Sequence, residues 1–512
     1  MRTENTIKNS LTSTISSITA MILGLIAQSI FIRLLGAEYL GLNGLFANIL
    51  TCLSIFELGI GNAIVYHLYK PISENDKEKI KSLMQFYRKA YNIIALLITI
   101  LGMLLIPVLK YIVGEVTVEI NLYIIYILFL FSTLSSYFVA YKRSLLYAYQ
   151  KNYIINIVHI IYLISLNFLQ LLLLFFTKNY YIYLIIKIIC QILENIIITV
   201  IVNKKYKFIT EKKFNKLDKS VEKDIFNKVK ALVFHKIGYV IVMGTDNIII
   251  SMFIGVISVG YYSNYSTIIS AVNSLFATIV SSATASIGNL IITETCKKRY
   301  QTFKKLRFLN FWLACFSGVC ILTIMQPFIK IWVGEQYLLG ITVLFTLVLN
   351  YYQKMMRYSY STFKDAGGIW IEDKYVPLVE SLLNIVASIV LLKFFGLAGV
   401  FMGTIISGLA LWCYSYPKFV YKKLFNRSYI QYTKETLGYI GLFILLAMLT
   451  YCISTLFVVS NNYLQVIINT LIALVVPNTI LVILFRKTEN FKYFLELLSK
   501  ITKKIKHKVG EV

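Results

Sequence analysis

Charged residues are scarce in this chain of 512 residues. Only 15% of the positions are Asp, Glu, Lys or Arg, whereas 58% are apolar or aromatic. Soluble domains have about 25% charged residues, so this composition excludes a soluble globular protein. It also excludes a disordered chain, a collagen and a small disulfide-rich scaffold.

Motifs for reaction chemistry are also lacking. All of the 7 cysteines except Cys296 lie in apolar runs, and no CxxC pair or Cys/His cluster indicates a disulfide framework or a zinc site. The sequence has no GxxxxGK phosphate loop, no GxSxG elbow and no HExxH pair. We therefore predict that the chain is not an enzyme, with no catalytic residue, no metal and no bound cofactor, and that it is not driven by its own ATP hydrolysis.

What the chain has instead is a series of apolar runs, many longer than about 18 residues, which is the length that indicates a transmembrane helix. The strands of a β-barrel would be about 10 residues long and alternating. We predict an all-α polytopic membrane protein with 14 spans and an uncleaved first helix. The spans are 11–35, 40–67, 90–113, 121–141, 153–177, 180–202, 229–254, 261–292, 308–332, 338–360, 376–395, 397–417, 435–459 and 463–485.

The positions of the basic residues test this topology. With the N-terminus in the cytoplasm, 44 of the 51 Lys and Arg fall in predicted inner segments, as the positive-inside rule requires. We therefore predict that both termini are cytoplasmic. The net charge of +27 is interpreted as a topology signal and a contact with anionic lipid headgroups, not as a nucleic-acid footprint. The predicted outer loops are too short to form the large outer domain that polymerases and glycosyltransferases of lipid-linked sugars usually carry.

Two motifs recur along the chain at almost the same offset. The pattern P-x-x-K-x-x-V-G-E begins at Pro107 and again at Pro327, 220 residues later, and the pattern Leu/Ile-Gly-x4-Gly begins at Leu35 and again at Ile254, 219 residues later. We predict two six-helix lobes related by a parallel repeat, with two extra helices at the C-terminus. The predicted parts are an N-lobe (1–202), a basic linker (203–228), a C-lobe (229–421), helices thirteen and fourteen (434–486) and a basic tail (487–512).

At several of these positions the chain resembles Wzx-type polysaccharide flippases of the MOP superfamily. Residues 31–42 (FIRLLGAEYLGL) and 57–63 (ELGIGNA) look like the first two helices of that family, and residues 244–262 look like its helix seven and eight region. Residues 365–378 and 396–404 resemble helices ten to twelve of Gram-positive members. The superfamily also contains MATE exporters, which usually have twelve helices, and lipid II flippases, so the predicted 14 spans fit the flippase branches better.

The resemblance implies a multi-pass protein of the bacterial plasma membrane that moves undecaprenyl-diphosphate-linked oligosaccharide to the outer leaflet for capsule or exopolysaccharide synthesis. It implies alternating access through a cationic cleft, driven by H⁺ or Na⁺, by the membrane potential or by removal of product. Its partners would be the lipid-linked oligosaccharide, membrane lipids and the polymerase and glycosyltransferases of the pathway. The alternatives are a MATE-like exporter of small cations, which would need an acidic cleft, a lipid II flippase, or an enzyme acting on lipid-linked sugars.

Charged residues within the predicted spans are the candidate site, because each costs about 2.5–3.5 kcal/mol to insert and so needs a reason to be there. Three cations, Arg33, Lys187 and Lys236, are predicted to line the cleft and bind the diphosphate. Alternatively, Arg33 and Lys236 extend to the headgroups, and Lys187 pairs with a glutamate between helices.

The acidic residues and histidines of the spans are candidates for ion or proton coupling. They are Glu57, Glu194, Asp246 and His235. The alternatives are a protonated carboxyl hydrogen-bonded between helices and, for His235 as for His159, an ordinary core histidine.

A further charged group surrounds Gly367 and Gly368 at the predicted inner face. It comprises Arg357, Asp365, Glu372 and Asp373. We interpret it as a gate or entry point for the lipid headgroup, or alternatively as a solvated turn.

Overall fold

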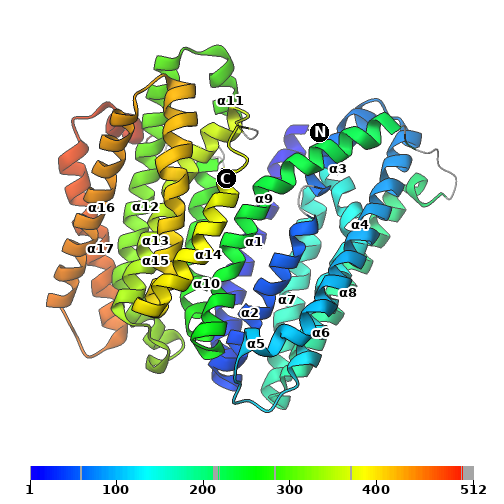
Figure 1. Cartoon of the computed structure of the whole chain (residues 1–512), viewed down its shortest axis with the longest axis horizontal. Helices are drawn as coiled ribbons and strands as arrows, with labels where there is room; N and C mark the ends of the chain where they lie inside the picture. Colours follow the sequence, from blue (N-terminus) through cyan, green and yellow to red (C-terminus); the bar gives the residue numbers. More distant parts are fainter. Residues whose placement is uncertain are drawn as a thin grey trace, which may run out of the picture. The chain divides into compact units, whose positions relative to one another are not determined.

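The computed structural model describes residues 2–57, 60–211, 217, 219–281, 284–369, 372–496 and 499. These residues are helical and contain no β-strand, which confirms the prediction of an all-α protein (Figure 1). By its internal contacts the chain divides into two compact units, Met1–Ser263 (unit 1) and Asn264–Val512 (unit 2). The predicted lobe boundaries at residues 202 and 229 stay predictions.

Unit 1 consists of long helices joined by short turns. Asn side chains cap two of these helices, since Asn121 accepts from the backbone at the start of α6 and Asn179 at the start of α8. Within the unit, α1 packs along α7, and α8 packs against both α6 and α7. The elements are α1 (Arg2–Leu35), α2 (Ala37–Leu53), η1 (Ser54–Glu57), α3 (Ile60–Ser73), α4 (Lys77–Leu105), η2 (Ile106–Val108), α5 (Leu109–Val113), α6 (Leu122–Ala148), α7 (Asn152–Thr177), α8 (Tyr180–Lys205), η3 (Lys207–Thr210), α9 (Lys219–Phe253) and the start of α10 (Val256–Ser281).

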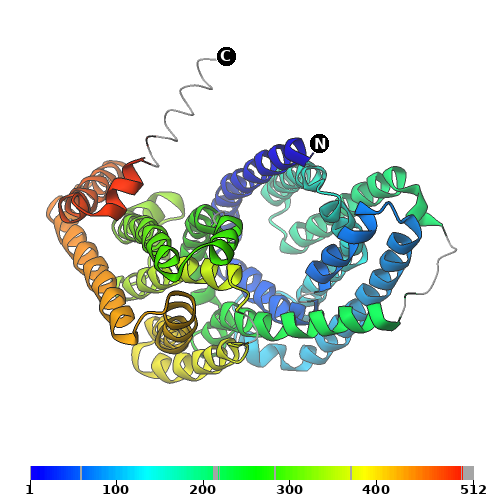
Figure 2. The same cartoon turned by 90° about the horizontal axis from the view of Figure 1, so that it is seen from above.

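Unit 2 is organised around α12 and contains the rest of α10. Its other elements are α11 (Thr284–Thr293), α12 (Cys296–Trp332), η4 (Glu335–Tyr337), α13 (Ile341–Ala366), α14 (Val376–Phe395), α15 (Leu397–Ala410), the π-helical η5 (Leu411–Leu424), α16 (Tyr429–Leu456) and α17 (Asn462–Phe485). The last two helices lie together at one edge of the unit (Figure 2). Two hydrogen bonds attach α17 to α12: the Asn469 amide donates to the Thr323 carbonyl at 2.7 Å, and the Trp312 indole donates to Asn478 at 2.8 Å. Such interhelical bonds hold helices together where lipid provides no hydrophobic driving force.

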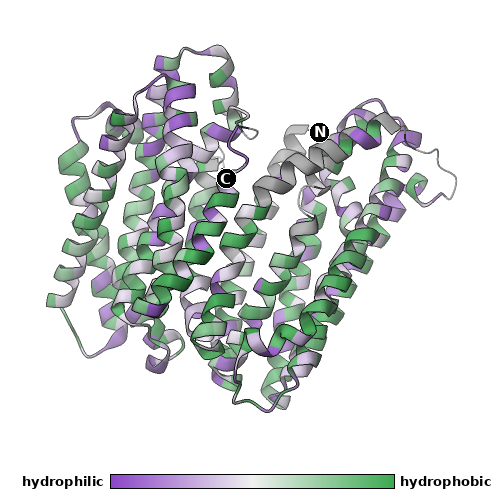
Figure 3. Cartoon of the chain, in the orientation of Figure 1, coloured by the Kyte–Doolittle hydropathy of each residue, from purple (hydrophilic) through white to green (hydrophobic). Residues whose placement is uncertain are grey.

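Within the described residues, ten helices are long and apolar enough to cross a membrane, by length and composition. Hydrophobic residues dominate the sides of these helices (Figure 3). Of the most apolar stretch of each helix, 72% is buried in α12 but only 11% in α1, so most spans present apolar side chains outward whereas α12 forms a core. The protein is therefore a multi-pass membrane protein, while the count of fourteen spans stays a prediction.

The repeated glycine motif forms a close helix crossing within unit 1. Gly36 and Gly255 each separate two helices and have positive φ angles, 95° and 119°. Five residues after each, Gly41 of α2 and Gly260 of α10 meet where the two helices cross. A Cβ atom on Gly41 would overlap the backbone of Val256, and one on Gly260 would overlap that of Ala37. Since Ala37 and Val256 are also 219 residues apart, the two halves of this Gly41–Gly260 crossing are equivalent under the repeat.

Candidate functional site

Unit 1 contains a cavity of about 650 Å³ whose wall is partly charged. A carboxylate from η1 and a guanidinium from α6 line it together with tyrosine, serine and asparagine side chains. The lining residues are Glu57, Gly61, Val65, Tyr69, Tyr91, Ala140, Arg143, Ser144, Tyr147 and Asn152. A polar cavity inside an apolar helical unit is where a charged ligand can be held away from lipid. We refer to it as the unit-1 cavity.

Glu57 reaches this cavity because the helix that carries it is interrupted. The predicted span 40–67 consists of α2, the single 3-10 turn η1 that ends at Glu57, and α3, which begins at Ile60. The Tyr137 hydroxyl of α6 donates a hydrogen bond to the Glu57 carboxylate. The carboxylate thus lies at a break in the helical path and is held by a neighbouring helix.

A cluster of ionisable groups around the buried Glu194 adjoins the cavity and joins three helices. Arg143 of α6 lies 3.3 Å from one carboxylate oxygen of Glu194 on α8 and donates to the Asn195 side chain at 3.0 Å. His159 of α7 approaches the other Glu194 oxygen at 3.1 Å through its Nδ1 atom. The Glu194 side chain is 4% exposed and that of Arg143 26%. The guanidinium therefore has one side on a buried acid and another on the cavity.

Two of the three predicted substrate-binding cations, Arg33 and Lys187, are absent from the lining of this cavity. Lys187 of α8 is half-buried, with its ammonium 5.2 Å from the centre of the Phe129 ring, and it is absent from the cavity lining. Arg33 is exposed in the last turn of α1. Lys236 lies on α9, but its side chain, like that of His235, is outside the described residues. In place of the alternative pair between Lys187 and a glutamate, Glu194 pairs with Arg143.

Asp246, the remaining coupling candidate, lies elsewhere in unit 1. It is 6% exposed on α9 and lies beside Tyr262 of α10. Glu57 lines the unit-1 cavity and Glu194 is connected to it through Arg143, whereas Asp246 lies between α9 and α10.

The predicted gate residues belong to unit 2, where two of them fasten the loop between α13 and α14. Glu372 forms an ion pair with Lys423 of η5, and the Lys423 ammonium lowers the pKa of this carboxyl. Asp373 is buried, pairs with Lys364 and accepts from the Ser415 hydroxyl at 2.8 Å. The interpretation as a solvated turn therefore does not describe Asp373, which is the anchor of the loop.

The other two gate candidates differ from each other. Arg357 of α13 lies 2.6 Å from the buried Glu380 of α14, and its side chain passes over Gly408 of α15, where a Cβ atom would collide with it. Asp365 is exposed at the end of α13. Arg357 therefore ties two helices of unit 2 together.

Two arginines that form ion pairs between helices were missed by the sequence reasoning. Arg143 and Arg307 were both counted among inner basic segments, because they lie next to other Lys and Arg residues. Arg307 of α12 is 2% exposed and pairs with Glu435 of α16 among tyrosine side chains. The acidic residues gave a signal, because Glu194 and Glu435 needed cationic partners. An arginine at the end of a span can extend its side chain either into water or back toward such an acid.

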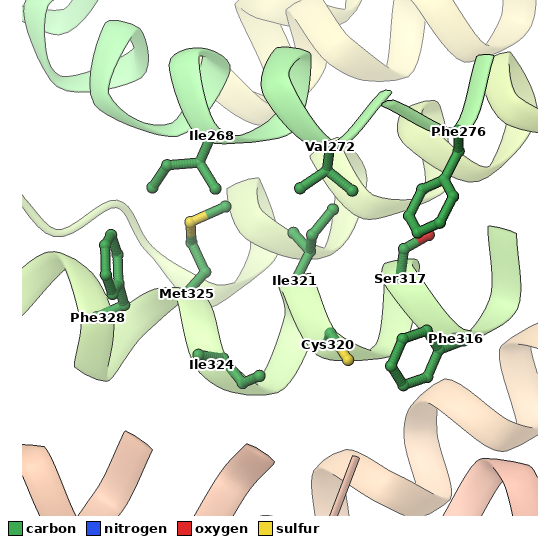
Figure 4. Close-up of a pocket in the computed structure, with 10 residues that line it drawn as sticks. All are labelled: Ile268, Val272, Phe276, Phe316, Ser317, Cys320, Ile321, Ile324, Met325 and Phe328. Atoms are coloured by element: carbon green, nitrogen blue, oxygen red, sulfur yellow. The ribbon is translucent and has the colours of Figure 1, made fainter. Parts of the chain in front are cut away.

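Unit 2 also has a second, purely apolar pocket of about 320 Å³ between α10 and α12 (Figure 4). The hydroxyl of Ser317, the one alcohol in its lining, is used in bonds to the Leu313 carbonyl and the Tyr351 hydroxyl. The lining residues are Ile268, Val272, Phe276, Phe316, Ser317, Cys320, Ile321, Ile324, Met325 and Phe328. This pocket can hold hydrocarbon and offers nothing to a charged group.

Within the described residues, no group of three or more His, Cys, Asp or Glu side chains could hold a metal ion. Arg143 and Glu57 bring ionisable groups to the wall of the unit-1 cavity. Their arrangement suits holding an anion or exchanging a proton.

Comparisons with known proteins agree with this picture. A family model described as "Polysaccharide biosynthesis protein" matches residues 6–285. Among solved structures, the chain is similar to a lipid II flippase, MurJ, in an inward closed conformation, with a TM-score of 0.69 and 18% identity over 94% of this chain and 99% of that one. It is also similar to an inward-facing multidrug resistance MATE transporter of the MOP superfamily, with a TM-score of 0.63 and 15% identity over 77% of this chain and 92% of that one.

A third similar structure is a mutant form of the MATE transporter VcmN of Vibrio cholerae, with a TM-score of 0.56 and 14% identity over 83% of this chain and 98% of that one. At these identities the likeness establishes the fold. No curated protein sequence matches the chain.

Proposed function

Because the chain belongs to the polysaccharide biosynthesis protein family of the MOP superfamily, we propose that it is a flippase for undecaprenyl-diphosphate-linked oligosaccharide repeat units. It would move them from the inner to the outer leaflet of the bacterial plasma membrane, with both termini cytoplasmic, for capsule or exopolysaccharide synthesis. The observation that carries this proposal is the unit-1 cavity, in which Arg143 and Glu57 bring charge into an apolar helical unit. A headgroup with two phosphates needs such a polar path, because its transfer through hydrocarbon is prohibitive.

The substrate divides into parts with opposite requirements, and the chain has surfaces for both. The diphosphate would be held by cations, with Arg143 as the first candidate because its guanidinium borders the cavity and can bind two oxygens at once. Arg33, Lys187 and Lys236 remain candidates for the same role at other points of the path. The hydrocarbon chain would contact lipid.

Coupling to H⁺ or Na⁺ is proposed at Glu194 first. This carboxylate is shared between Arg143 and His159, so that protonation at the cluster weakens its hold on the guanidinium. A freed guanidinium is then available to a phosphate group. Glu57 is the second candidate because it lines the cavity that Arg143 also lines, and Asp246 and His235 are retained as candidates.

A lipid II flippase is the alternative that a specific observation favours. The fold likeness to MurJ extends over 94% of this chain, compared with 77% and 83% for the two MATE transporters above. Both flippase functions require an anionic, lipid-linked headgroup. A MATE-like exporter of small cations would instead require that the cavity lose affinity for its ligand when Glu57 and Glu194 are neutralised.

The proposal is tested by deleting the gene and complementing it with variants. We expect deletion to leave lipid-linked repeat units inaccessible to a glycan label outside the cell and polymer to be lost. Arg143→Gln should restore less than a tenth of the polymer. Lys142→Gln, which removes the same charge one residue away from the cavity lining, should restore nearly all of it. Outward exposure of the repeat units in the deletion strain would exclude the flippase proposal. Loss of lipid II exposure in its place would assign the alternative.

A further inference from the structure

Two lysine side chains lie close together at one end of unit 1. Lys151 lies in the turn between α6 and α7, and Lys205 is the last residue of α8. Their ammonium groups are close enough to interact, and burial together with the Lys205 charge lowers the pKa of Lys151. No Asp or Glu pairs with either lysine in the part of the chain that the structure describes.

The position of Lys151 is fixed by its surroundings. Its ammonium lies 3.3 Å from the Tyr206 hydroxyl and 5.6 Å and 5.5 Å from the ring centres of Tyr149 and Tyr206, which stack at 4.6 Å. A surface lysine that only extends to the headgroups would not be held among two rings in this way. The cation is thus pre-positioned.

The turn that carries Lys151 is itself held rigid. Gln150 adopts a left-handed conformation with φ 57°, and the side chain of Asn9 on α1 clamps both sides of the turn. It donates to the Gln150 carbonyl at 2.9 Å and accepts from the Tyr153 amide at 2.8 Å. A side chain mounted on a clamped turn loses little freedom on binding a ligand.

The start of α7 adds a third positive feature at the same place. This helix of 26 residues begins at Asn152; Lys151, its capping residue, makes no side-chain capping bond, and the Asn9 side chain accepts from one first-turn amide, that of Tyr153. The N-terminus of a long helix carries a partial positive charge and favours anions. The Lys151 ammonium therefore lies against the Tyr206 hydroxyl at the start of α7, with the Lys205 ammonium close to it.

We propose that Lys151, Lys205 and Tyr206 form a binding site for a phosphate group. A phosphate oxygen set can accept from both ammonium groups and the hydroxyl, and its negative charge removes the repulsion between the lysines. The site borders the unit-1 cavity, since Tyr147 and Asn152 on either side of the turn line that cavity. Two sources have this chemistry: the headgroup of an anionic membrane lipid and the diphosphate of a lipid-linked sugar. The proposal stands independently of transport.

The first test uses the full-length chain in neutral detergent, with thermal unfolding followed in chloride and in inorganic diphosphate at equal ionic strength. We expect diphosphate to raise the melting temperature of the wild type. Lys151→Gln and Lys205→Gln should each weaken diphosphate binding about tenfold, because each removes a charge-assisted bond. Tyr206→Phe, which keeps the ring, should weaken it less. Lys204→Gln is the matched control, because Lys204 is an exposed neighbour on the same helix end outside the cluster.

The second test distinguishes the two sources. The wild type and the lysine variants are placed in nanodiscs of phosphatidylcholine, and the binding of added phosphatidylglycerol and of added farnesyl diphosphate is measured for each. A Lys151- and Lys205-dependent effect of phosphatidylglycerol assigns an ordinary lipid headgroup, and one of farnesyl diphosphate assigns a lipid-linked diphosphate. If Lys204→Gln weakened diphosphate binding as much as Lys151→Gln does, the effect would come from diffuse surface charge and the site would be overturned. The site would also be overturned if diphosphate changed the melting temperature no more than chloride does. Since binding is measured, these outcomes are independent of whether the protein translocates any substrate.

Discussion

At the scale of residues, the two members of the Arg143–Glu194 pair are not equivalent. The Glu194 side chain is 4% exposed and the Arg143 side chain 26%, because the guanidinium borders the cavity. A buried charge that loses its partner is costly, whereas a charge that can be hydrated is not. Glu194 therefore depends on Arg143 for its stability, whereas Arg143 can leave the pair and bind a ligand in the cavity.

This asymmetry predicts an unequal pair of substitutions. Arg143→Gln should destabilise the protein by about 3 kcal/mol, because it leaves the buried carboxylate with His159 as its main partner, while Glu194→Gln should cost about 1 kcal/mol. The double variant should be more stable than Arg143→Gln alone. Thermal and denaturant unfolding in detergent measure all three, and equal costs for the two single variants would contradict the argument.

A second prediction concerns the ion pair between Glu372 and Lys423. The lowered pKa of Glu372 means that its stabilising effect is present above the ordinary carboxyl pKa of about 4.3 and is lost as the pH falls through the lowered value. As the pH is lowered, pepsin should begin to cut the loop between α13 and α14 at a lower pH in the wild-type protein than in Lys423→Gln. At neutral pH, Glu372→Gln and Lys423→Gln should accelerate tryptic cleavage at Lys374 to a similar degree. An additive effect in the double variant would mean that the two side chains act separately.

At the scale of elements, the helices could be predicted from the sequence, but the contacts between them could not. Each apolar run became helix, because period and length are local properties of the sequence. The turn η1 at Glu57 interrupts a run that hydropathy alone makes continuous, although the glycines that follow it allow such a break. Arg143 was not selected as a site residue for a related reason: a cation within one turn of a span end can lie in water or against a buried acid, and this depends on the packing of the helices.

The Gly41–Gly260 crossing gives a prediction at this scale. Gly41→Ala and Gly260→Ala should each destabilise the protein by about 1–3 kcal/mol, because a methyl group would overlap backbone atoms that cannot rotate away. Gly438→Ala in α16 is the control: nothing lies within 4 Å of the added atom, and alanine favours helix by about 1 kcal/mol. The measurement is the melting temperature of purified protein. A fall for Gly438→Ala as large as that for Gly41→Ala would remove the steric explanation.

At the scale of the whole molecule, the sequence predicted the class of the protein, while its substrate and its site residues stay predictions. Composition, the repeat and the resemblance led to a membrane fold and a family that the comparisons bear out. Arg33 was selected as a cation in a matching motif, yet its side chain is exposed at a helix end, and Lys187 packs on a phenylalanine ring. Such positions depend on which faces of several helices meet, and that information is not local.

The predicted topology can be checked with a thiol that the chain already carries. Cys296 is exposed at the start of α12, within a segment predicted to be inside. In a variant that keeps only this cysteine, a membrane-impermeant maleimide should label it in inverted vesicles and not in intact cells. A cysteine introduced at the exposed position of Lys178, in a predicted outer turn, should show the reverse. Labelling of Cys296 in intact cells would show that the topology is the reverse of the predicted one.

The Gly41–Gly260 crossing also bears on ancestry. If the repeat arose when two copies of one gene fused, the ancestral protein was a dimer of identical chains. One glycine codon then supplied the glycine on both sides of this contact. One mutation there would have damaged both halves at once, and selection on that codon was correspondingly strong. After fusion each glycine mutates alone, yet neither is released, because a methyl group on either helix meets the backbone of the other. The crossing is thus a place where duplication multiplied the targets for damage without creating any redundancy.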